Sequence, residues 1–435
     1  MRRAGLRQPA LLLAFVVIAT AQTSDAVPAP PARPPPPAPR AASRQPLLQL
    51  QGRFSPGAGS NSPYARLPQL MTWSASAATA TFMGSANVTV TLNGSLLALP
   101  AADQPLALVK GNFPSCAFQF SLNGTVVGTG STSPSRPVLT WRMGGLSKSA
   151  AHTLTITKTT EAKFGGAWLT AIKLDSGGGF LPPLAPPAAA SGRRLLFLGD
   201  SLSNGYGNIG NSTCSKAKNA EFENSLLAWP SLVAAALQAD YQLVAWSGGG
   251  LSIYTAANRL EWPEELRPRA NPKTAELFQR ADAMDPASLY DLRAWSPQVV
   301  LLAAGINDVG GLSLDKWGQI DTGKQGAPAL EFWLERYLAL AVQIRQAYPA
   351  ATLVHVVWPV EVLLGIRTAE QAAIYLQYMA AAYSYLEAAG IGNQHLLQVK
   401  GTGFNSSSWC GQHPDAAAHA QIAQQVTTFL DTVVL

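Results

Sequence analysis

Short runs in which apolar and polar residues alternate dominate residues 47–178. A period of two residues buries one face of a strand and leaves the other face polar. Two of the runs end at Asn-Gly pairs, Asn93-Gly94 and Asn123-Gly124, which are typical of hairpin turns. No helical pattern interrupts the series, so this segment is predicted to be an all-β sandwich. The expected strands lie at 79–83, 87–92, 117–122, 153–157 and 168–174.

The pattern changes after residue 192. Apolar runs, typical of strands buried on both faces, now alternate with stretches of helical periodicity. Strands that alternate with helices predict a parallel sheet covered by helices on both faces, which is a three-layer α/β domain of flavodoxin-like type. The strands are expected at 194–198, 241–246, 298–303, 352–358 and 396–399, and helices at 329–347, 369–389 and 416–430.

Proline-rich segments separate these parts. Residues 22–46 contain Pro35-Pro36-Pro37 and are predicted to be a linker of disordered or polyproline type. The stretch 255–296 interrupts the α/β rhythm with prolines and charges, and it is long enough to be a binding loop. The expected division is 1–21, signal peptide; 22–46, linker; 47–178, β-sandwich; 179–192, second linker; and 193–435, α/β domain.

The first residues of the chain are typical of a secretory signal. Arg2 and Arg3 precede the apolar run 11–18, and Ala19-Thr20-Ala21 fits a cleavage site. An uncleaved anchor is the alternative, but the apolar run is short for a bilayer span. We therefore expect a secreted protein that has no stable membrane association after cleavage.

A net charge of +6 would suggest a nucleic-acid partner if the positive charge were spread along the whole chain, but it is concentrated near the N-terminus. Residues 1–53 contain seven Arg and a single acid, Asp25, whereas the remaining residues hold 24 basic and 24 acidic side chains. The body of the chain therefore has no electrostatic bias toward phosphate backbones, and no nucleic-acid partner is expected.

Five Asn-x-Ser/Thr triplets are candidate glycosylation sites if the source is a eukaryote, although such triplets also arise by chance. They begin at Asn87, Asn93, Asn123, Asn211 and Asn405.

Three cysteines are present. Cys116 shares a strand face with Phe118 and Phe120, which predicts a buried free thiol. Cys214 and Cys410 fall in loops near the candidate catalytic residues described below, so they are the expected disulfide in an oxidising compartment. The wide spacings do not fit a zinc site.

The candidate chemistry begins with Gly199-Asp200-Ser201-Leu202, which directly follows an expected strand. A serine at this point lies at the carboxyl edge of the sheet, where open α/β sheets place their sites. Three further segments follow expected strands or precede the last helix. They are Ser247-Gly248-Gly249-Gly250, Gly305-Ile306-Asn307-Asp308 and His413-Pro414. Ser, Gly, Asn and His in this order resemble the four blocks of the SGNH (GDSL-type) hydrolases.

Each block has a chemical role in the resulting hypothesis. Ser201 is the candidate nucleophile, because a hydroxyl attacks an acyl carbonyl when a base takes its proton. Its own N–H, the N–H of Gly248 and the amide of Asn307 are candidate oxyanion-hole donors. His413 is the candidate base, because Pro414 keeps it extended before the last helix. His419, within that helix, is the competing histidine.

The acid that orients the base is where the pattern departs from many SGNH hydrolases, which place Asp three residues before the His. Cys410 occupies that position here, and Asp415 is expected to cap the last helix. A backbone carbonyl is the expected partner of His413, giving a Ser–His dyad. Asp200 and Asp308 are expected to brace loops.

The whole mature chain is similar to carbohydrate esterase family 2, which joins a jelly-roll-like sandwich to an SGNH hydrolase domain. Family members remove acetyl groups from plant polysaccharides, and some lack an orienting acid. The resemblance implies a secreted serine esterase acting on acetylated carbohydrate through an acyl-enzyme, without metal or cofactor. It rests on 152–162, 168–175, 204–207 with Cys214, 245–250, 292–308 and Cys410 before His413-Pro414.

Two aromatic residues beside the blocks, Tyr206 and Trp409, are candidate sugar contacts or ordinary packing residues. Two rival functions also remain open. One is an SGNH lipase or thioesterase, which would have an apolar groove around Ser201 rather than an open cleft with aromatic platforms. The other is a carbohydrate-binding protein with an inactive hydrolase domain, against which the four intact blocks argue.

Overall fold

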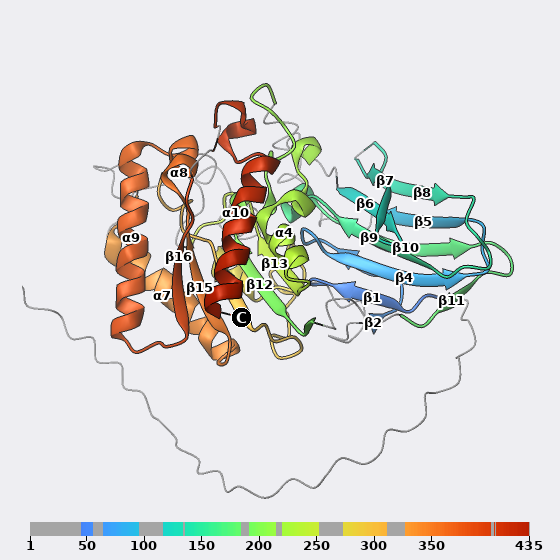
Figure 1. Cartoon of the computed structure of the whole chain (residues 1–435), viewed down its shortest axis with the longest axis horizontal. Coiled ribbons are helices and arrows are strands. Elements are labelled where there is room, and N and C mark those ends of the chain that lie inside the picture. Colours follow the sequence, from blue (N-terminus) through green and yellow to red (C-terminus); the bar gives the residue numbers. More distant parts are fainter. Residues whose placement is uncertain are drawn as a thin grey trace, which may run out of the picture. The chain divides into compact units, whose positions relative to one another are not determined.

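The computed structural model describes residues 45–54, 64–94, 116–133, 135–183, 191–214, 220–251, 273–310, 327–401, 404 and 406–434. The predicted signal peptide, almost all of the first linker, Asn405 and residues 255–272 of the predicted binding loop lie outside these ranges. Within them, two antiparallel sheets are followed by one parallel sheet with helices, as the sequence predicted (Figure 1).

The first part of the chain is a β-sandwich. Alternating burial along its strands places apolar side chains from both sheets in one core. Phe82, Phe118 and Phe120 meet Val88 and Val90 across this core. In strand order, one sheet contains β2 (Tyr64–Ala65), β1 (Leu48–Gln51), β4 (Ala77–Met83), β9 (His152–Lys158), β6 (Ala117–Leu122) and β7 (Thr125–Ser131), with β11 (Gly179–Leu181) also on β4; the other contains β3 (Gln69–Met71), β10 (Ala167–Leu174), β5 (Val88–Asn93) and β8 (Val138–Met143).

Two details of the sandwich differ from expectation. Residues Gly179–Leu181, assigned to the second linker, form β11 and pair with Thr81–Met83 of β4. Asn123-Gly124 joins the paired strands β6 and β7, but Asn93-Gly94 is not a hairpin turn between paired neighbours, since β5 pairs with β8 and β10. An Asn-Gly pair marks a turn without fixing which strand comes next in space.

The second part is an α/β domain around a parallel sheet in the order β13-β12-β14-β15-β16. Four of its five strands are almost wholly buried, which explains their mostly apolar sequences. The edge strand Gln394–Gln398 is only partly buried. The order is that of flavodoxin-like sheets, in which the connections reverse direction beside the first strand. The strands are β12 (Arg194–Gly199), β13 (Asp240–Ala245), β14 (Val299–Leu302), β15 (Thr352–Val357) and β16 (Gln394–Gln398).

Helices cover both faces of this sheet. Right-handed crossovers place α4 (Trp229–Ala236), between β12 and β13, on the face opposite α7 (Leu330–Ala347) and α9 (Ala369–Ala388). Helix α10 (Ala416–Phe429) packs against α4, and α7 packs against α9 (Figure 1). Shorter helices are α3 (Ser201–Asn204), α6 (Thr274–Phe278) and α8 (Val360–Ile366); α6 lies inside the predicted loop 255–296. No helix in the described part of the chain is long and apolar enough to cross a membrane.

The sandwich and the α/β domain share a buried contact. Trp73, from the sandwich, belongs to the apolar core of the α/β domain, and its Nε1 donates to the carbonyl of Ala281 at 2.7 Å. The buried Arg53 guanidinium donates to Gln242 Oε1 at 2.9 Å and to the carbonyl of Phe278 at 2.7 Å. These donors are withdrawn from water and find their acceptors across the contact, as buried polar groups generally do.

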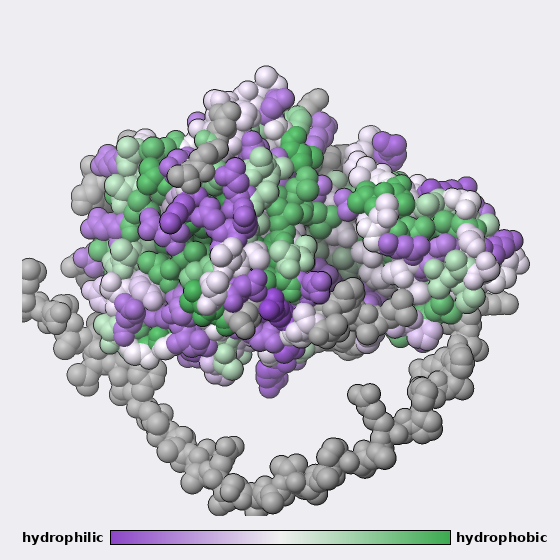
Figure 2. Space-filling view, in the orientation of Figure 1, coloured by the Kyte–Doolittle hydropathy of each residue, from purple (hydrophilic) through white to green (hydrophobic). Residues whose placement is uncertain are grey.

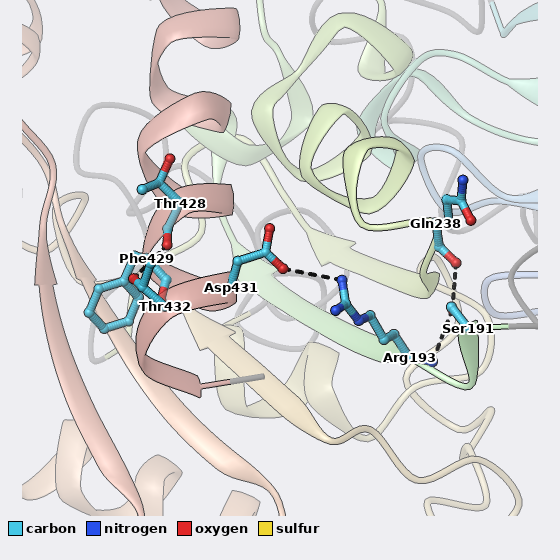
Figure 3. Close-up of polar contacts among 7 residues, drawn as sticks. All are labelled: Ser191, Arg193, Gln238, Thr428, Phe429, Asp431 and Thr432. Atoms are coloured by element: carbon cyan, nitrogen blue, oxygen red, sulfur yellow. Dashed lines mark hydrogen bonds and ion pairs between the residues drawn. The ribbon is translucent and has the colours of Figure 1, made fainter.

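Figure 3 shows polar contacts close to the start of β12. Ser191 Oγ donates to the carbonyl of Gln238 at 2.7 Å, and Arg193 forms an ion pair with Asp431 at 3.3 Å. Both charged side chains are partly exposed, so this pair contributes only about 0–1 kcal/mol. Polar and apolar side chains are interspersed over the face shown in Figure 2, as is usual for a surface in water.

Candidate active site

Three of the four predicted segments meet because their strands are neighbours. β12 lies between β13 and β14, and all three run in the same direction. The segments that follow these strands therefore begin at one edge of the sheet. They carry Ser201, the turn 247–250 and Asn307, respectively.

Ser201 is the first residue of helix α3. The side chain of Asp200 caps this helix by accepting a hydrogen bond from the N–H of Leu202 at 3.0 Å. The N–H of Ser201 has no partner within the helix, because the first amides of a helix have no preceding turn. Gly205 ends the helix with φ of 81°, a left-handed conformation that suits glycine. This short helix fixes the position of the serine hydroxyl.

His413, which contacts Ser201, lies 212 residues later in the sequence, in the loop before α10. Its Nε2 lies 2.9 Å from Ser201 Oγ, and its Nδ1 lies 2.8 Å from the carbonyl oxygen of Gly411. A carbonyl only accepts hydrogen bonds, so the contact assigns the ring proton to Nδ1. Nε2 is then the unprotonated nitrogen that accepts the Ser201 hydroxyl. This is the tautomer that a general base requires.

The chain turns sharply before His413 so that a carbonyl can face its ring. Gly411 and Gln412 have φ of 56° and 67°, a left-handed region that non-glycine residues seldom adopt. Asp415 instead caps α10, where its Oδ1 accepts the N–H of Ala418 at 2.9 Å. The arrangement agrees with the dyad hypothesis, in which a backbone carbonyl orients the base.

The competing histidine, His419, has the environment of a core residue and not that of a catalytic base. His419 is buried, and its Nδ1 accepts the N–H of Trp229 at 3.3 Å. Burial disfavours the charged imidazolium and lowers the pKa of His419 to about 3. His355, in β15, is also buried, and its ring bonds Tyr337 of helix α7 and Gln394 of β16. Neither environment matches the serine contact of His413.

The two remaining oxyanion candidates lie beside the nucleophile strand. Gly248 has φ of 84° within the turn after β13. Asn307 is 8% exposed, and its Nδ2 lies 3.0 Å from the carbonyl of Gly249 and 3.2 Å from Asp200 Oδ2. Both amide hydrogens thus have protein acceptors. To donate to an oxyanion, Asn307 Nδ2 must therefore share the hydrogen that it directs at Asp200 or give up that longer bond.

Arg367 is a residue of this site that sequence reasoning missed. Its guanidinium donates to Asn307 Oδ1 at 3.1 Å and to the carbonyl of Ile306 at 3.1 Å and 3.2 Å. These bonds orient the amide so that Nδ2 points toward Asp200. Burial raises the pKa of Asp200 to about 7, and the positive charge of Arg367 opposes that increase. Asp308 braces the neighbouring loop by accepting the N–H of Leu251 at 2.8 Å.

A disulfide joins the loop after the nucleophile to the loop before the base. It links Cys214 and Cys410, whose Cα atoms are 5.6 Å apart, as the sequence predicted. Cys116 is free and buried. Gly207 packs against Cys410, since a Cβ added there would lie 2.9 Å from its carbonyl oxygen. The disulfide therefore secures a close contact between the two loops.

A model of the GDSL-like lipase/acylhydrolase family matches residues 197–421, which include all four segments. The chain belongs to this family. The predicted resemblance to SGNH hydrolases is thereby confirmed.

Two curated relatives of this chain have names that refer to carbohydrate substrates. An acetylxylan esterase/glucomannan deacetylase of Cellvibrio japonicus is 33% identical over 159 residues, 36% of this chain and 38% of the relative. The cellulase/esterase CelE of Acetivibrio thermocellus is 29% identical over 218 residues, 50% of this chain and 23% of the relative. The chain thus spans less than half of the length of either relative.

Solved structures extend the fold similarity to both domains. A family two carbohydrate esterase from Clostridium thermocellum, described in complex with a cello-oligosaccharide, has a TM-score of 0.69 at 20% identity and covers 89% of this chain and 99% of its own. A family two carbohydrate esterase from Cellvibrio japonicus has a TM-score of 0.63 at 19% identity, covering 90% and 96%. The chain therefore has the two-domain fold of carbohydrate esterase family 2.

The two aromatic candidates, Tyr206 and Trp409, differ in environment. Tyr206 is partly buried, and its ring centroid is 4.8 Å from that of His413. Lys163, from the sandwich, lies 5.9 Å from the same tyrosine ring. Trp409 is only 3% exposed and belongs to the apolar core, so it is a packing residue and not an open sugar platform. Within the described ranges, no group of three metal-ligating side chains is placed to hold a metal ion.

The roles of His413 and Asp415 can be separated by mutation. Asp415→Asn should keep kcat within about threefold, because Asn is also a good helix N-cap. His413→Ala should reduce kcat by at least about 1000-fold, because it removes the base. Steady-state hydrolysis of an aryl acetate measures both. A loss in Asp415→Asn comparable with that in His413→Ala would show that a carboxylate assists the base.

Reduction of the disulfide should lower activity before the sheet unfolds. Without the bond, the loop that carries Gly411 and His413 loses its attachment to the loop after Ser201. Activity and far-UV circular dichroism followed against increasing reductant would measure the two events. Cys116→Ala is the matched control and should show the same loss, since Cys116 is outside the bond. Simultaneous loss of activity and ellipticity would contradict a local effect.

Proposed function

We propose that this acylhydrolase is a serine esterase that removes O-acetyl groups from carbohydrate through an acyl-enzyme. The observation that carries the proposal is the pair of contacts made by His413, at 2.9 Å to Ser201 Oγ and 2.8 Å to the Gly411 carbonyl. A hydroxyl beside an unprotonated imidazole nitrogen is a nucleophile with its general base in place.

The first half of the proposed reaction transfers the acyl group to the enzyme. Ser201 Oγ attacks the carbonyl carbon of the ester while His413 Nε2 takes the hydroxyl proton. The tetrahedral intermediate collapses when the bond to the sugar oxygen breaks, and that oxygen takes the proton from Nε2. The products are an acetylated Ser201 and a free sugar hydroxyl.

The second half regenerates the serine. Water attacks the acetyl carbonyl while His413 Nε2 takes its proton, and the bond to Ser201 Oγ breaks with return of that proton to Oγ. Acetic acid is released. The imidazolium formed in each half keeps its Nδ1–H directed at Gly411, so the ring does not have to reorient between steps.

The negative oxygen of each intermediate requires donors on one side of Ser201. We assign this role to the N–H of Ser201, the N–H of Gly248 and Nδ2 of Asn307. A donor aimed at developing charge is worth about 3 kcal/mol in such a site. Arg367 supports the assignment by holding Asn307 Oδ1, which leaves the donor end of the amide toward the nucleophile strand.

The proposed substrate is an acetylated plant-type polysaccharide. The names of the curated relatives and the two-domain fold support this class over a lipid. Tyr206 is the proposed aromatic contact for a sugar ring beside His413. We also propose that the protein is secreted, which the basic and apolar N-terminal residues and the Cys214–Cys410 disulfide support.

Acetate release tests the proposed reaction and the substrate class together. The wild type should release acetate from acetylated xylan or glucomannan and from an aryl acetate, while Ser201→Ala should lose at least about 1000-fold in kcat on each. Circular dichroism should show an unchanged fold, because Ser201 lies at a strand end outside the apolar core. Binding of the polysaccharide without hydrolysis by the wild type would favour the inactive-hydrolase alternative, and a preference for long acyl chains would favour a lipase.

Replacement of Asn307 tests the oxyanion assignment. Asn307→Ala should reduce kcat by about 100-fold with KM little changed, because the donor serves charge that exists only in the transition state. Asn307→Asp keeps Oδ1 for Arg367 but removes the donor, so it should lose at least as much. Full activity in Asn307→Asp would mean that Asn307 only braces its loop, and a pure KM effect would make it a substrate contact.

A further inference from the structure

A buried carboxylate from the sandwich lies between two segments of the candidate active site. Glu161 follows β9 and is completely buried. Its Oε2 accepts the side-chain N–H of Asn204 at 3.0 Å and the backbone N–H of Ser247 at 2.7 Å. One oxygen atom of the N-terminal domain therefore joins two segments of the hydrolase domain.

Both partners of Glu161 belong to elements that carry proposed catalytic groups. Asn204 is the last residue of helix α3, whose first residue is Ser201. Ser247 begins the turn that contains Gly248. The contact therefore fixes the position of the nucleophile helix relative to the turn that supplies a proposed oxyanion donor.

The orientation of the Asn204 amide is set by a second residue of the sandwich. Ser74 Oγ donates to Asn204 Oδ1 at 2.7 Å, so the amide nitrogen faces Glu161. Two sandwich residues thus hold both ends of one amide in helix α3.

Two further buried ionisable residues, Lys158 and Glu223, belong to the same cluster. The buried Lys158 Nζ donates to the Glu161 carbonyl at 3.0 Å, and its positive charge acts on the carboxyl groups of Glu161 and Glu223. Burial and the nearby Glu161 raise the pKa of Glu223 well above its ordinary value. Glu223 also accepts the backbone N–H of Glu161, which anchors the segment.

We propose that Glu161 is a positioning residue for catalysis, by which the sandwich holds helix α3 and the Ser247–Gly250 turn in their reactive arrangement. The proposal rests on the esterase function above. It gives the sandwich a part in the chemical step that is separate from any binding of carbohydrate. A small displacement of such groups is costly, since an error of about 1 Å in a reactive geometry can reduce a rate about 100-fold.

Two substitutions at Glu161 separate hydrogen bonding from charge. Glu161→Leu removes both bonds and should reduce kcat by about 10- to 100-fold, with KM changed less than about twofold. Glu161→Gln should recover most of the activity, because its oxygen can replace Oε2. Its amide nitrogen then takes the place of Oε1, which has no hydrogen-bond partner among the described residues.

Trp73→Phe is the matched control for the contact between the domains. It removes the 2.7 Å hydrogen bond to Ala281 but leaves Glu161, Asn204 and Ser247 untouched. We expect its kcat and KM to stay within about twofold of the wild type. Asn204→Ala is the second test and decides the matter if Glu161→Leu does not fold. It removes one of the two bonds and should also lower kcat without raising KM.

The decisive measurement is kcat and KM on an aryl acetate for these four variants, with folding checked by thermal unfolding. Equal losses in Glu161→Leu and Trp73→Phe, a loss confined to KM, or full activity in Glu161→Leu would overturn the positioning role. Where Glu161→Leu is unfolded, full activity in Asn204→Ala would do the same. Failure of the proposed function looks different, since the wild type itself would then release no acetate.

Discussion

The parallel pairing of β12 with β13 and β14 is the constraint on which the site depends. It brings the ends of three strands to one edge of the sheet, although the segments that follow them are far apart in sequence. Ser201, the turn 247–250 and Asn307 owe their proximity to this register. The apolar strands themselves supply the driving force, because their side chains are almost completely removed from water on both faces.

His413 is positioned by other features, a disulfide and a left-handed turn. The loop before α10 is attached to the nucleophile side by the disulfide, and its left-handed turn at Gly411 places a carbonyl against His413. A carbonyl fixes the tautomer as well as a carboxylate does, but its partial charge stabilises the imidazolium less. The proposed chemistry therefore relies on ring orientation and on oxyanion donors more than on a buried acid beside the base.

Local sequence patterns predicted much of this structure, and long-range contacts account for what they missed. Each of these patterns can be recognised from a few consecutive residues. They are the period-two alternation, the apolar strands and the GDS, GGG, GxND and His-Pro segments. Arg367 and Glu161 have no such signal, because they act on Asn307 and on Asn204 from elements far away in sequence. Trp409 was ambiguous for the same reason, since only the packing of the core shows that its ring is buried.

Covalent labelling tests the central claim, that Ser201 is the nucleophile activated by His413, most directly. After treatment with a fluorophosphonate, peptide mapping by mass spectrometry should find the phosphonyl group on Ser201, and the labelling rate should fall sharply in His413→Ala. A modification on another residue, or continued hydrolysis of an aryl acetate while Ser201 stays unmodified, would contradict the account.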